Sequence, residues 1–484
     1  MKIPFLKSKS KAKPTPKQPP RTAQSAKPAQ HAPAPRPFPF AQQDEPVPSP
    51  EEVAAANAAH AFLLRHNQAP EQLELQPLMD AMLAAARAGL RGEAGGLPML
   101  PTFLSPDGQV PENTPVAVLD AGGTHLRTAV VAFHEKTPEL QRVETRPMPG
   151  SDAPVTWEEF IRTAADALEP LLDGATRVGV CFCYPAEVTP ELDARVLELT
   201  KEVRITDCEG RFVCADLAAE LQKRGRTGLR FTLLNDTPAA YLRGTTGICT
   251  SHAHSFAGMV SGTGTNTCCA VPVREIEKLN RPDDDSRMLV NLESGSFAGV
   301  PQGDFDRALD AASDNPGAYL FEKMTGGRYL GALCRLALIG AAEEGLFSAA
   351  VSEKLRALET LETPDADLFA FDTESGAIPA LCGAPETDRT AAAAIISAIF
   401  ERAARAITAN IGAILLLVNG GDNRYRPLIV SMDGSLFANS NLLRPAIADT
   451  MKVFLAEERK RYGVCKAMDH ATLIGAAVAA LMQP

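Results

Sequence analysis

The sequence lacks several features that mark common protein classes. No apolar run approaches the ~20 residues that a membrane-spanning helix needs, and residues 1–7 lack the continuous apolar region of a secretory signal. No G-x-x-x-x-G-K-[ST] motif is present, which excludes a P-loop, and no G-x-G-x-x-G opens a strand-to-helix turn for a dinucleotide. We therefore expect a cytoplasmic protein that holds any phosphate by another kind of turn.

Cysteine is present, but not in patterns typical of metal binding. Ten cysteines are spread over 484 residues, with no C-x-x-C pair and no histidine at zinc-finger spacing. We expect buried, reduced thiols of the kind found in cytosolic enzymes. His252 and His254 form an H-A-H sequence that we interpret as part of a surface hairpin rather than a metal site.

Acidic residues are absent from residues 1–43, which carry nine Lys or Arg. The formal net charge of the whole chain is −11, so the residues after position 43 carry a net charge of about −20. Thirteen of the 38 prolines occur by residue 50. Such a segment has little apolar surface to offset the entropy of ordering, and we predict a disordered basic tail at residues 1–50. Because the body is acidic and no aromatic residues alternate with the lysines, no nucleic-acid partner is expected.

Strand and helix patterns alternate after the tail, which predicts an α/β fold. A helical lead-in is expected at 51–65 and 77–90, followed by a β-hairpin with strands at 116–120 and 127–133. We expect further strands at 178–183, 231–234, 258–261, 267–271 and 428–431, and helices at 157–172, 213–223, 304–312, 317–340, 389–412, 441–457 and 471–482.

Three glycine turns could hold an anionic phosphate. They lie at residues 122–124, between the two hairpin strands, at 261–266, again between apolar strands, and at 433–435. Glycine leaves the backbone N–H groups unshielded, and each turn adds a hydroxyl. Taken singly, each is also compatible with an ordinary β-turn.

A candidate general base follows the strand that ends at Leu234. Asn235 and Asp236 come next, after which Thr237 can cap a helix and Pro238 can open it. The positive end of the helix dipole favours the carboxylate form of Asp236 by roughly 0.3–1 kcal/mol. An ionised, positioned carboxylate is what a general base requires, although an acid here could also stabilise only its own helix.

Together these segments resemble the hexokinase family of the actin-like ATPase superfamily, from about residue 75 to the C-terminus. Order, spacing and residue type agree along the chain. The matching segments are 119–127 (LDAGGTHLR), 182–185 (FCYP), 200–201 with 208–210 (TK and CEG), 234–237 (LNDT), 262–266 (GTGTN), 291–297 (NLESGSF), 305–307, 315–317, 321–324, 329–331, 431–436 (SMDGSL) and 475–477 (GAA).

The resemblance implies two actin-like (ribonuclease H-like) α/β domains that flank a cleft. The small domain would span 114–233 and include the C-terminal helix at 470–484. The large domain would contain the lead-in at 51–113 and residues 234–469. Closure of the domains around the sugar would exclude water and align the nucleophile. A monomer or homodimer without a transmembrane segment is expected.

The resemblance also implies a reaction: transfer of the γ-phosphoryl group of Mg-ATP to the 6-hydroxyl of a hexose, most naturally glucose, as the entry step of glycolysis. Asp236 would be the general base, and Lys201 would stabilise charge on the transferring group. Mg²⁺ would be held by ATP, with Asp120 reaching it through water and no direct protein ligand. The implied sugar contacts are Cys183, Tyr184, Thr200, Lys201, Asn235, Asp236, Asn266, Glu293 and Glu322, and the implied nucleotide contacts are Asp120, Gly122, Gly123, Thr124, His125, Arg127, Thr263, Gly327, Arg328, Asp433, Gly434 and Ser435.

Four residues depart from the family pattern. Cys183 stands where Ser is usual, Ser294 where Trp is frequent, Tyr319 where Gln occurs and His125 where Asn is common. These changes affect the expected choice of sugar and the KM, since the base, the lysine and the three glycine turns are all present.

Three alternatives share the fold class. A hexokinase-like sugar sensor with little or no catalysis predicts loss of Asp236 or Lys201, and both are present. A filament-forming or chaperone-like actin-fold ATPase has no reason to keep the sugar-contact residues in hexokinase order. A sugar kinase of the bacterial repressor type usually carries a Cys-rich zinc segment, which this sequence lacks.

Overall fold

The computed structural model describes residues 48–197, 203–247, 253 and 255–483. The predicted tail lies outside these residues except for its last three positions, of which Pro50 already begins the first helix with Ser49 as its N-cap. Thr200, Lys201, His252 and His254 also lie outside the described residues.

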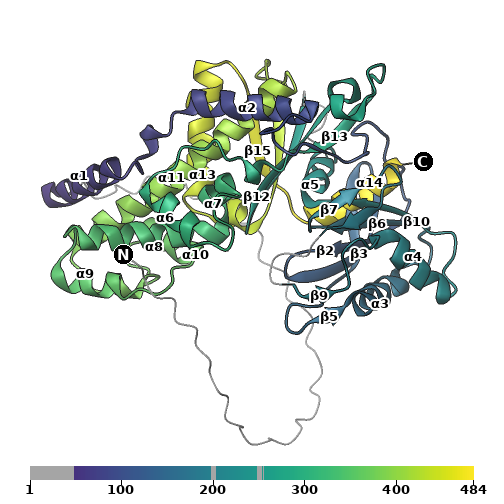
Figure 1. Ribbon diagram of the computed structural model, residues 1–484, viewed down its shortest axis with the longest axis horizontal. Coiled ribbons are helices and arrows are strands. Elements are labelled where there is room, and N and C mark those ends of the chain that lie inside the picture. Colours follow the sequence, from purple (N-terminus) through teal and green to yellow (C-terminus); the bar gives the residue numbers. More distant parts are fainter. Residues whose placement is uncertain (1–47, 198–202, 248–252, 254, 484) are drawn as a thin grey trace, which may run out of the picture. The chain divides into compact units, whose positions relative to one another are not determined.

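Two β-sheets and a large set of helices make up the described chain (Figure 1). The five-stranded sheet has the order β10-β6-β2-β3-β4, and the six-stranded sheet has the order β1-β13-β12-β11-β14-β15. The strands of these sheets are β1 (Leu100–Pro101), β2 (Val116–Ala121), β3 (His125–His134), β4 (Thr137–Pro147), β6 (Arg177–Phe182), β10 (Arg230–Leu234), β11 (Ser255–Ser261), β12 (Thr265–Pro272), β13 (Arg287–Asn291), β14 (Leu428–Asp433) and β15 (Gly463–Ala467). Two small ladders join β5 (Val155–Thr156) to β9 (Ile205–Thr206) and β7 (Ala186–Val188) to β8 (Ala194–Val196).

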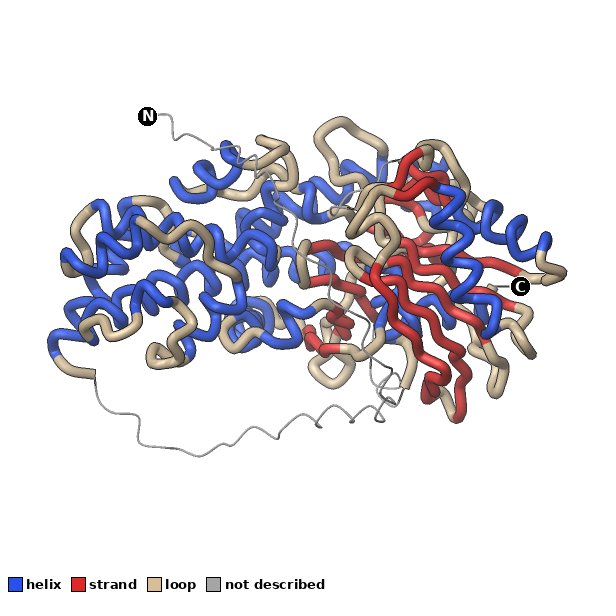
Figure 2. Tube along the Cα trace, turned by 90° about the horizontal axis from the view of Figure 1, so that it is seen from below, coloured by secondary structure: helices blue, strands red, loops and turns tan. Residues whose placement is uncertain are grey.

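Helices surround the sheets, and Figure 2 shows that the strands gather on one side of the described chain while the other side is helical. None of these helices is both long enough and apolar enough to cross a bilayer. The helices are α1 (Pro50–Arg65), α2 (Leu75–Arg91), α3 (Trp157–Leu168), α4 (Val213–Lys223), α5 (Asp236–Gly244), α6 (Asp304–Ala312), α7 (Leu320–Thr325), α8 (Gly327–Glu343), α9 (Ala349–Arg356), α10 (Thr363–Phe371), α11 (Glu386–Leu417), α12 (Ser435–Asn439), α13 (Leu443–Thr450) and α14 (Ala471–Met482).

The expected hairpin and all five further strands are present, and the predicted α/β class is confirmed. In each sheet a hairpin carries a glycine turn: β2 pairs with β3 around residues 122–124, and β11 pairs with β12 around 262–264. Beside each hairpin lies a parallel neighbour, β6 next to β2 and β14 next to β11. The same hairpin-plus-parallel-strand arrangement therefore occurs in both sheets.

Helices α5 and α14 lie between the two sheets. Helix α14 packs on β2, β6 and β10, while α5 packs on β11, β12 and β14, and the two helices pack on each other. Glycine permits three of these contacts. A Cβ on Gly179 of β6 would overlap the backbone of α14, one on Gly475 of α14 would overlap the backbone of α5, and one on Gly258 of β11 would overlap α5 from the opposite side.

The expected helices at 213–223, 304–312 and 471–482 have the predicted bounds, but the single helix expected at 317–340 is wrong. Gly326 has extended dihedrals (φ −83°, ψ 144°) and divides the segment into α7 and α8. The break brings the start of α8 onto the turn at 262–264, where Gly327 N–H donates to the Gly262 carbonyl at 2.8 Å. Tertiary contact therefore overrides the helical pattern here.

The helical lead-in is confirmed as α1 and α2, which both pack against α11. Helix α11 runs further than the 389–412 expected and includes most of the apolar run at 411–418. The helix expected at 441–457 is α13 followed by a π-helical segment at Met451–Glu458. The domain boundaries at 113/114, 233/234 and 469/470 stay a prediction.

Candidate functional site

The first glycine turn is anchored by an ion pair between a buried carboxylate and a half-buried guanidinium. Asp120 ends β2 with its side chain fully buried, and Arg127 Nε on the paired strand donates to its Oδ2 at 2.8 Å. Thr472 Oγ1 of α14 donates to the same oxygen at 2.9 Å. Although burial disfavours the charged guanidinium, the neighbouring Asp120 carboxylate raises the pKa of Arg127. This pair ties the mouth of the hairpin to the C-terminal helix.

Two backbone donors of this turn are available. The Gly122 N–H donates to the His125 carbonyl at 3.0 Å, whereas no atom of the described residues accepts from the N–H of Gly123 or Thr124. The Thr124 hydroxyl and His125 Nδ1 form a hydrogen bond of 2.7 Å at an exposed position. The turn therefore presents N–H groups at its tip, as a phosphate site requires.

The second and third glycine turns lie side by side. Gly434 has φ 110° and ψ 146°, a conformation that only glycine adopts readily, and a Cβ there would lie 2.5 Å from the Ser261 carbonyl oxygen. A Cβ on Gly262 would in turn lie 3.3 Å from the Gly434 Cα. The Arg328 N–H donates to the Thr263 carbonyl at 3.0 Å, and the Arg328 side chain is exposed. Residues 262–263, 327–328 and 434–435 thus lie together, whereas their contact with a nucleotide stays a prediction.

Asp236 occupies the first position of α5, so the expectation that Thr237 caps this helix is wrong. Asn235 is the N-cap residue by its extended backbone, and the Asp236 Oδ1 accepts from the Thr237 N–H at 2.8 Å. The Thr237 hydroxyl instead donates to Asn291 Oδ1 at 3.2 Å. Asp236 itself therefore satisfies a donor of the first helical turn, as acids at helix starts commonly do.

Asn266, Asn291 and Glu293 are joined by hydrogen bonds. Together with Asn235 and Glu322 we call them the amide–carboxylate group. Asn291 Nδ2 donates to Glu293 Oε1 at 2.7 Å, and Asn266 Nδ2 donates to the same oxygen at 3.0 Å. Asn266 Nδ2 also reaches Asn291 Oδ1 at 2.9 Å. Glu293 adopts φ 54°, a left-handed conformation that is uncommon for glutamate and concentrates at functional sites.

Asn235 and Glu322 complete this group from two other elements. Asn235 Nδ2 donates to the Phe182 carbonyl at 3.2 Å, while its Oδ1 is buried and accepts no hydrogen bond from the described residues. Glu322 of α7 accepts from the Thr265 N–H at 3.0 Å, and a Cβ on Gly264 would overlap its carboxylate. The group therefore extends to the edge of the second glycine turn.

Negative charge accumulates around Asp236. Burial and then the Asp236 carboxylate raise the pKa of Asp433 to about 6. The same two causes, in the same order, raise the pKa of Glu293 above its usual value. Because one carboxylate acts on both residues, Asp236 lies near both Asp433 of the third glycine turn and Glu293 of the amide–carboxylate group.

The strand-end segment at 182–185 also borders this region. Cys183 and Tyr184 are buried, and the Tyr184 hydroxyl donates to the Gly122 carbonyl at 2.6 Å. Cys183 Sγ lies 3.8 Å from Asp120 Oδ1. This segment therefore adjoins the first glycine turn, while Thr200 and Lys201 lie outside the described residues.

Sequence reasoning placed Asn291 in a matching segment without a role of its own, predicted only a capping role for Thr237 and assigned no role to Thr472. Asn291 forms hydrogen bonds with Thr237, Asn266 and Glu293. The only sequence feature that could have indicated its importance is that it is a polar residue at the end of the apolar strand β13. Thr472 bridges Asp120 and Arg127 across about 350 positions of sequence, and no local pattern indicates such a contact.

The chain matches known proteins over most of its length. Two family models described as hexokinase match residues 64–245 and 256–482. Hexokinase-1 of Nicotiana tabacum is 28% identical over 440 residues, covering 84% of this chain and 87% of that protein. Hexokinase-3 of Homo sapiens is 29% identical over 428 residues, covering 83% of this chain and 45% of that protein.

A solved structure supports the same assignment for the fold. A hexokinase from Schistosoma mansoni, complexed with glucose, superposes with a TM-score of 0.70 at 22% identity, covering 89% of this chain and 99% of its own. Sequence models, relatives and fold all confirm the predicted resemblance, and the chain belongs to the hexokinase family.

Proposed function

We propose that this protein is an active hexokinase, which transfers the γ-phosphoryl group of Mg-ATP to the 6-hydroxyl of a hexose, with glucose as the expected substrate and the entry of glycolysis as its setting. The observation that carries the proposal is that Asp236, at the start of α5, lies close to two kinds of group. Its carboxylate acts on Glu293, one of the amides and carboxylates that could bind a sugar, and on Asp433, which begins the third glycine turn.

The sugar is proposed to bind the amide–carboxylate group. Sugar hydroxyls both donate and accept, and a set of amide and carboxylate groups can satisfy several of them at once. The buried Oδ1 of Asn235, which accepts nothing from the described residues, fits a hydroxyl donor. Glu293 and Glu322 present further acceptors beside it.

Asp236 is proposed to accept the proton of the attacking hydroxyl. Its place at the first position of α5 favours the charged form that a base needs, and the Thr237 N–H holds one of its oxygens. A placed general base contributes typically 10²–10⁴-fold to the rate. Lys201, which lies outside the described residues, is proposed from the family resemblance to stabilise charge on the transferring group.

The glycine turns are proposed to bind the phosphates of a nucleoside triphosphate. The N–H groups of Gly123 and Thr124, which donate to no atom of the described residues, are available to phosphate oxygens, and the missing side chain of Gly434 lets the second and third turns approach each other closely. Mg²⁺ carried by ATP would neutralise charge on the phosphates. Asp120 would approach it through water with Oδ1, since Arg127 and Thr472 engage Oδ2.

The test is hexose-dependent release of ADP from Mg-ATP, measured with glucose, mannose, fructose and glucosamine. We expect turnover with at least glucose. Absence of turnover with all four sugars would contradict the proposal and favour the sugar-sensor alternative if glucose still binds.

The assignment of the base is tested by Asp236→Ala, with Asp449→Ala as the matched control, because Asp449 is an exposed aspartate on α13. Asp236→Ala is expected to lower kcat by ~10²–10⁴-fold while glucose binding remains detectable by calorimetry. Asp449→Ala is expected to leave kcat unchanged. Full turnover by Asp236→Ala would show that another residue is the base.

A further inference from the structure

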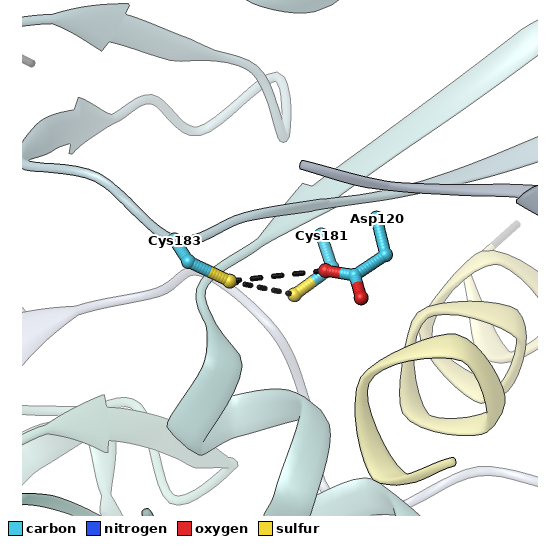
Figure 3. A group of neighbouring side chains, drawn as sticks. All are labelled: Asp120, Cys181 and Cys183. Carbon is cyan, nitrogen blue, oxygen red and sulfur yellow. Dashed lines mark hydrogen bonds between the residues drawn. The ribbon is translucent and has the colours of Figure 1, made fainter. Parts of the chain in front are cut away.

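Three buried side chains form a compact group behind the first glycine turn. The ligand atoms of Asp120, Cys181 and Cys183 all lie within 4.8 Å of one another (Figure 3). Asp120 and Cys181 are fully buried, and Cys183 is 8% exposed. The proposed phosphoryl transfer gives Cys181 no role.

The group is positioned by the sheet. Asp120 on β2 pairs in register with Cys181 on the parallel strand β6, so their side chains lie on the same face. Cys183 follows two residues later, and side chains two apart along an extended segment share a face. Sites on strands hold their geometry more closely than sites on loops.

The distances match a tetrahedral zinc site. Cys181 Sγ and Cys183 Sγ are 3.7 Å apart, and Cys183 Sγ is 3.8 Å from Asp120 Oδ1. Zinc bonds of about 2.3 Å to sulfur and about 2.0 Å to oxygen at the tetrahedral angle separate two sulfurs by about 3.8 Å and a sulfur from an oxygen by about 3.5 Å. These two distances therefore differ from the ideal values by a few tenths of an ångström or less, and the third pair, Cys181 and Asp120, lies within 4.8 Å.

We propose that Asp120, Cys181 and Cys183 bind one Zn²⁺ ion, with water in the fourth position, and that this ion inhibits the enzyme. Thiolates select zinc over Mg²⁺, which demands octahedral oxygen coordination, so the Mg²⁺ of the nucleotide does not compete for these ligands.

Charge balance supports the site. Before binding, the Asp120 carboxylate is paired with the Arg127 guanidinium. On binding, the two thiols lose two protons to solvent, both sulfurs and one carboxylate oxygen bond to zinc, and no oxidation occurs. The two new negative charges are matched by the two positive charges of the ion, so the net charge of this buried region is unchanged.

The surroundings also orient the carboxylate. Arg127 Nε and Thr472 Oγ1 both donate to Asp120 Oδ2, which turns Oδ1 toward the sulfurs. Outer partners of this kind fix the ligand and contribute to metal affinity.

The inhibitory part of the proposal rests on the proposed function. Asp120 is expected to approach the nucleotide's Mg²⁺, and Cys183 adjoins the expected sugar contacts. An ion that bonds to both residues withdraws them from these tasks. In the family pattern Ser is usual at position 183, so the sensitivity would be a property of this chain.

The experiment measures zinc binding and kinase activity separately on the full chain. ZnCl₂ is titrated without nucleotide against a chromophoric chelator, and hexose-dependent ADP release is measured with and without zinc and after excess chelator. The variants are Cys181→Ser and Cys183→Ser, each checked for folding by circular dichroism, with Cys382→Ser as the control because Cys382 is an exposed thiol far from the group in sequence.

We expect one zinc per chain, inhibition that the chelator reverses, and a loss of affinity of at least ~10–100-fold in both test variants but none in Cys382→Ser. Equal zinc binding in Cys181→Ser and the unmodified chain would overturn the metal site. A chain that binds one zinc through these cysteines but phosphorylates no hexose would retain the metal site and reject the proposed function. Zinc binding without inhibition of an active kinase would overturn the inhibitory role.

Discussion

The glycine turns and the amide–carboxylate group face the same aspartate but are built differently. The second and third turns contact each other through backbone atoms. Gly434 lies against the backbone of Ser261 and Gly262, and the Gly327 N–H donates to the Gly262 carbonyl. The amide–carboxylate group is made of side chains joined through Asn291. Substitutions in the turns should therefore act by steric overlap, whereas those in the side-chain group should act by lost hydrogen bonds and altered charge.

Gly434→Ala is the strongest test of the expectation that substitutions in the glycine turns act by steric overlap. The φ of 110° is strained for alanine, by ~1–3 kcal/mol, and the added Cβ would lie 2.5 Å from the Ser261 carbonyl oxygen. We expect a clear loss of thermal stability and a KM for ATP raised at least ~10-fold, with the KM for hexose less affected. The measurement is a melting curve with steady-state kinetics in both substrates.

Gly225→Ala is the control for that substitution. Gly225 has a φ of 83°, but a Cβ there would meet no atom within 4 Å. It therefore carries the backbone cost of ~1 kcal/mol without the overlap, and the KM for ATP should not change. If both variants lower stability and raise the KM for ATP equally, the effect of Gly434→Ala comes from its backbone conformation alone and not from packing between the turns.

Asp433→Asn tests the charge that surrounds Asp236. Its pKa of about 6 lies above the usual value of 3.8, so the ionised form costs stability at neutral pH, by up to about 3 kcal/mol. The penalty is full above pH 6 and is relieved as the pH falls from about 6 toward 4. Asp433→Asn should thus melt higher than the unmodified chain at pH 7.5 and equally at pH 4, whereas Asp449→Asn should show no such dependence.

Asn291→Ala tests the expectation that substitutions in the amide–carboxylate group act by lost hydrogen bonds. The substitution leaves Glu293 with one amide donor fewer and removes the acceptor of Thr237, at ~1–3 kcal/mol for groups left unpaired. We expect the KM for hexose to rise by ~10-fold or more, with little change in the KM for ATP.

The control is Asn441→Ala, which removes a hydrogen bond to Asp367 at 2.8 Å outside the site. It should lower stability without changing the KM for hexose. If Asn291→Ala behaves in the same way, Asn291 supports the fold and not the sugar contacts.

The smallest effect is expected from deletion of residues 1–43. They precede every segment that resembles the family, and they hold nine of the 48 cationic residues but no acid. We expect kcat and both KM values to remain within twofold. A change in hexose kinetics on deletion would assign the tail a role in catalysis.

Sequence reasoning succeeded where a local pattern and a family segment coincide. The β2–β3 hairpin and the bounds of α4, α6 and α14 follow from apolar periodicity and turn residues, whereas the start of α5 was predicted too late, at Pro238 in place of Asp236. It failed at Gly326, where a hydrogen bond to a turn about 60 residues away interrupts a good helical pattern. It also could not find Thr472 or Asn291, because their roles exist only through partners brought together by the fold.

The direct contacts at Gly179, Gly475 and Gly258 have a consequence for the position of Asp236. At these points α5 and α14 meet their neighbours mainly through main-chain atoms, because a Cβ on any of the three glycines would overlap a backbone carbonyl oxygen. A side chain at any of these positions is therefore expected to displace α5 or α14. Because Asp236 occupies the first position of α5, such a displacement would change its position relative to both sheets.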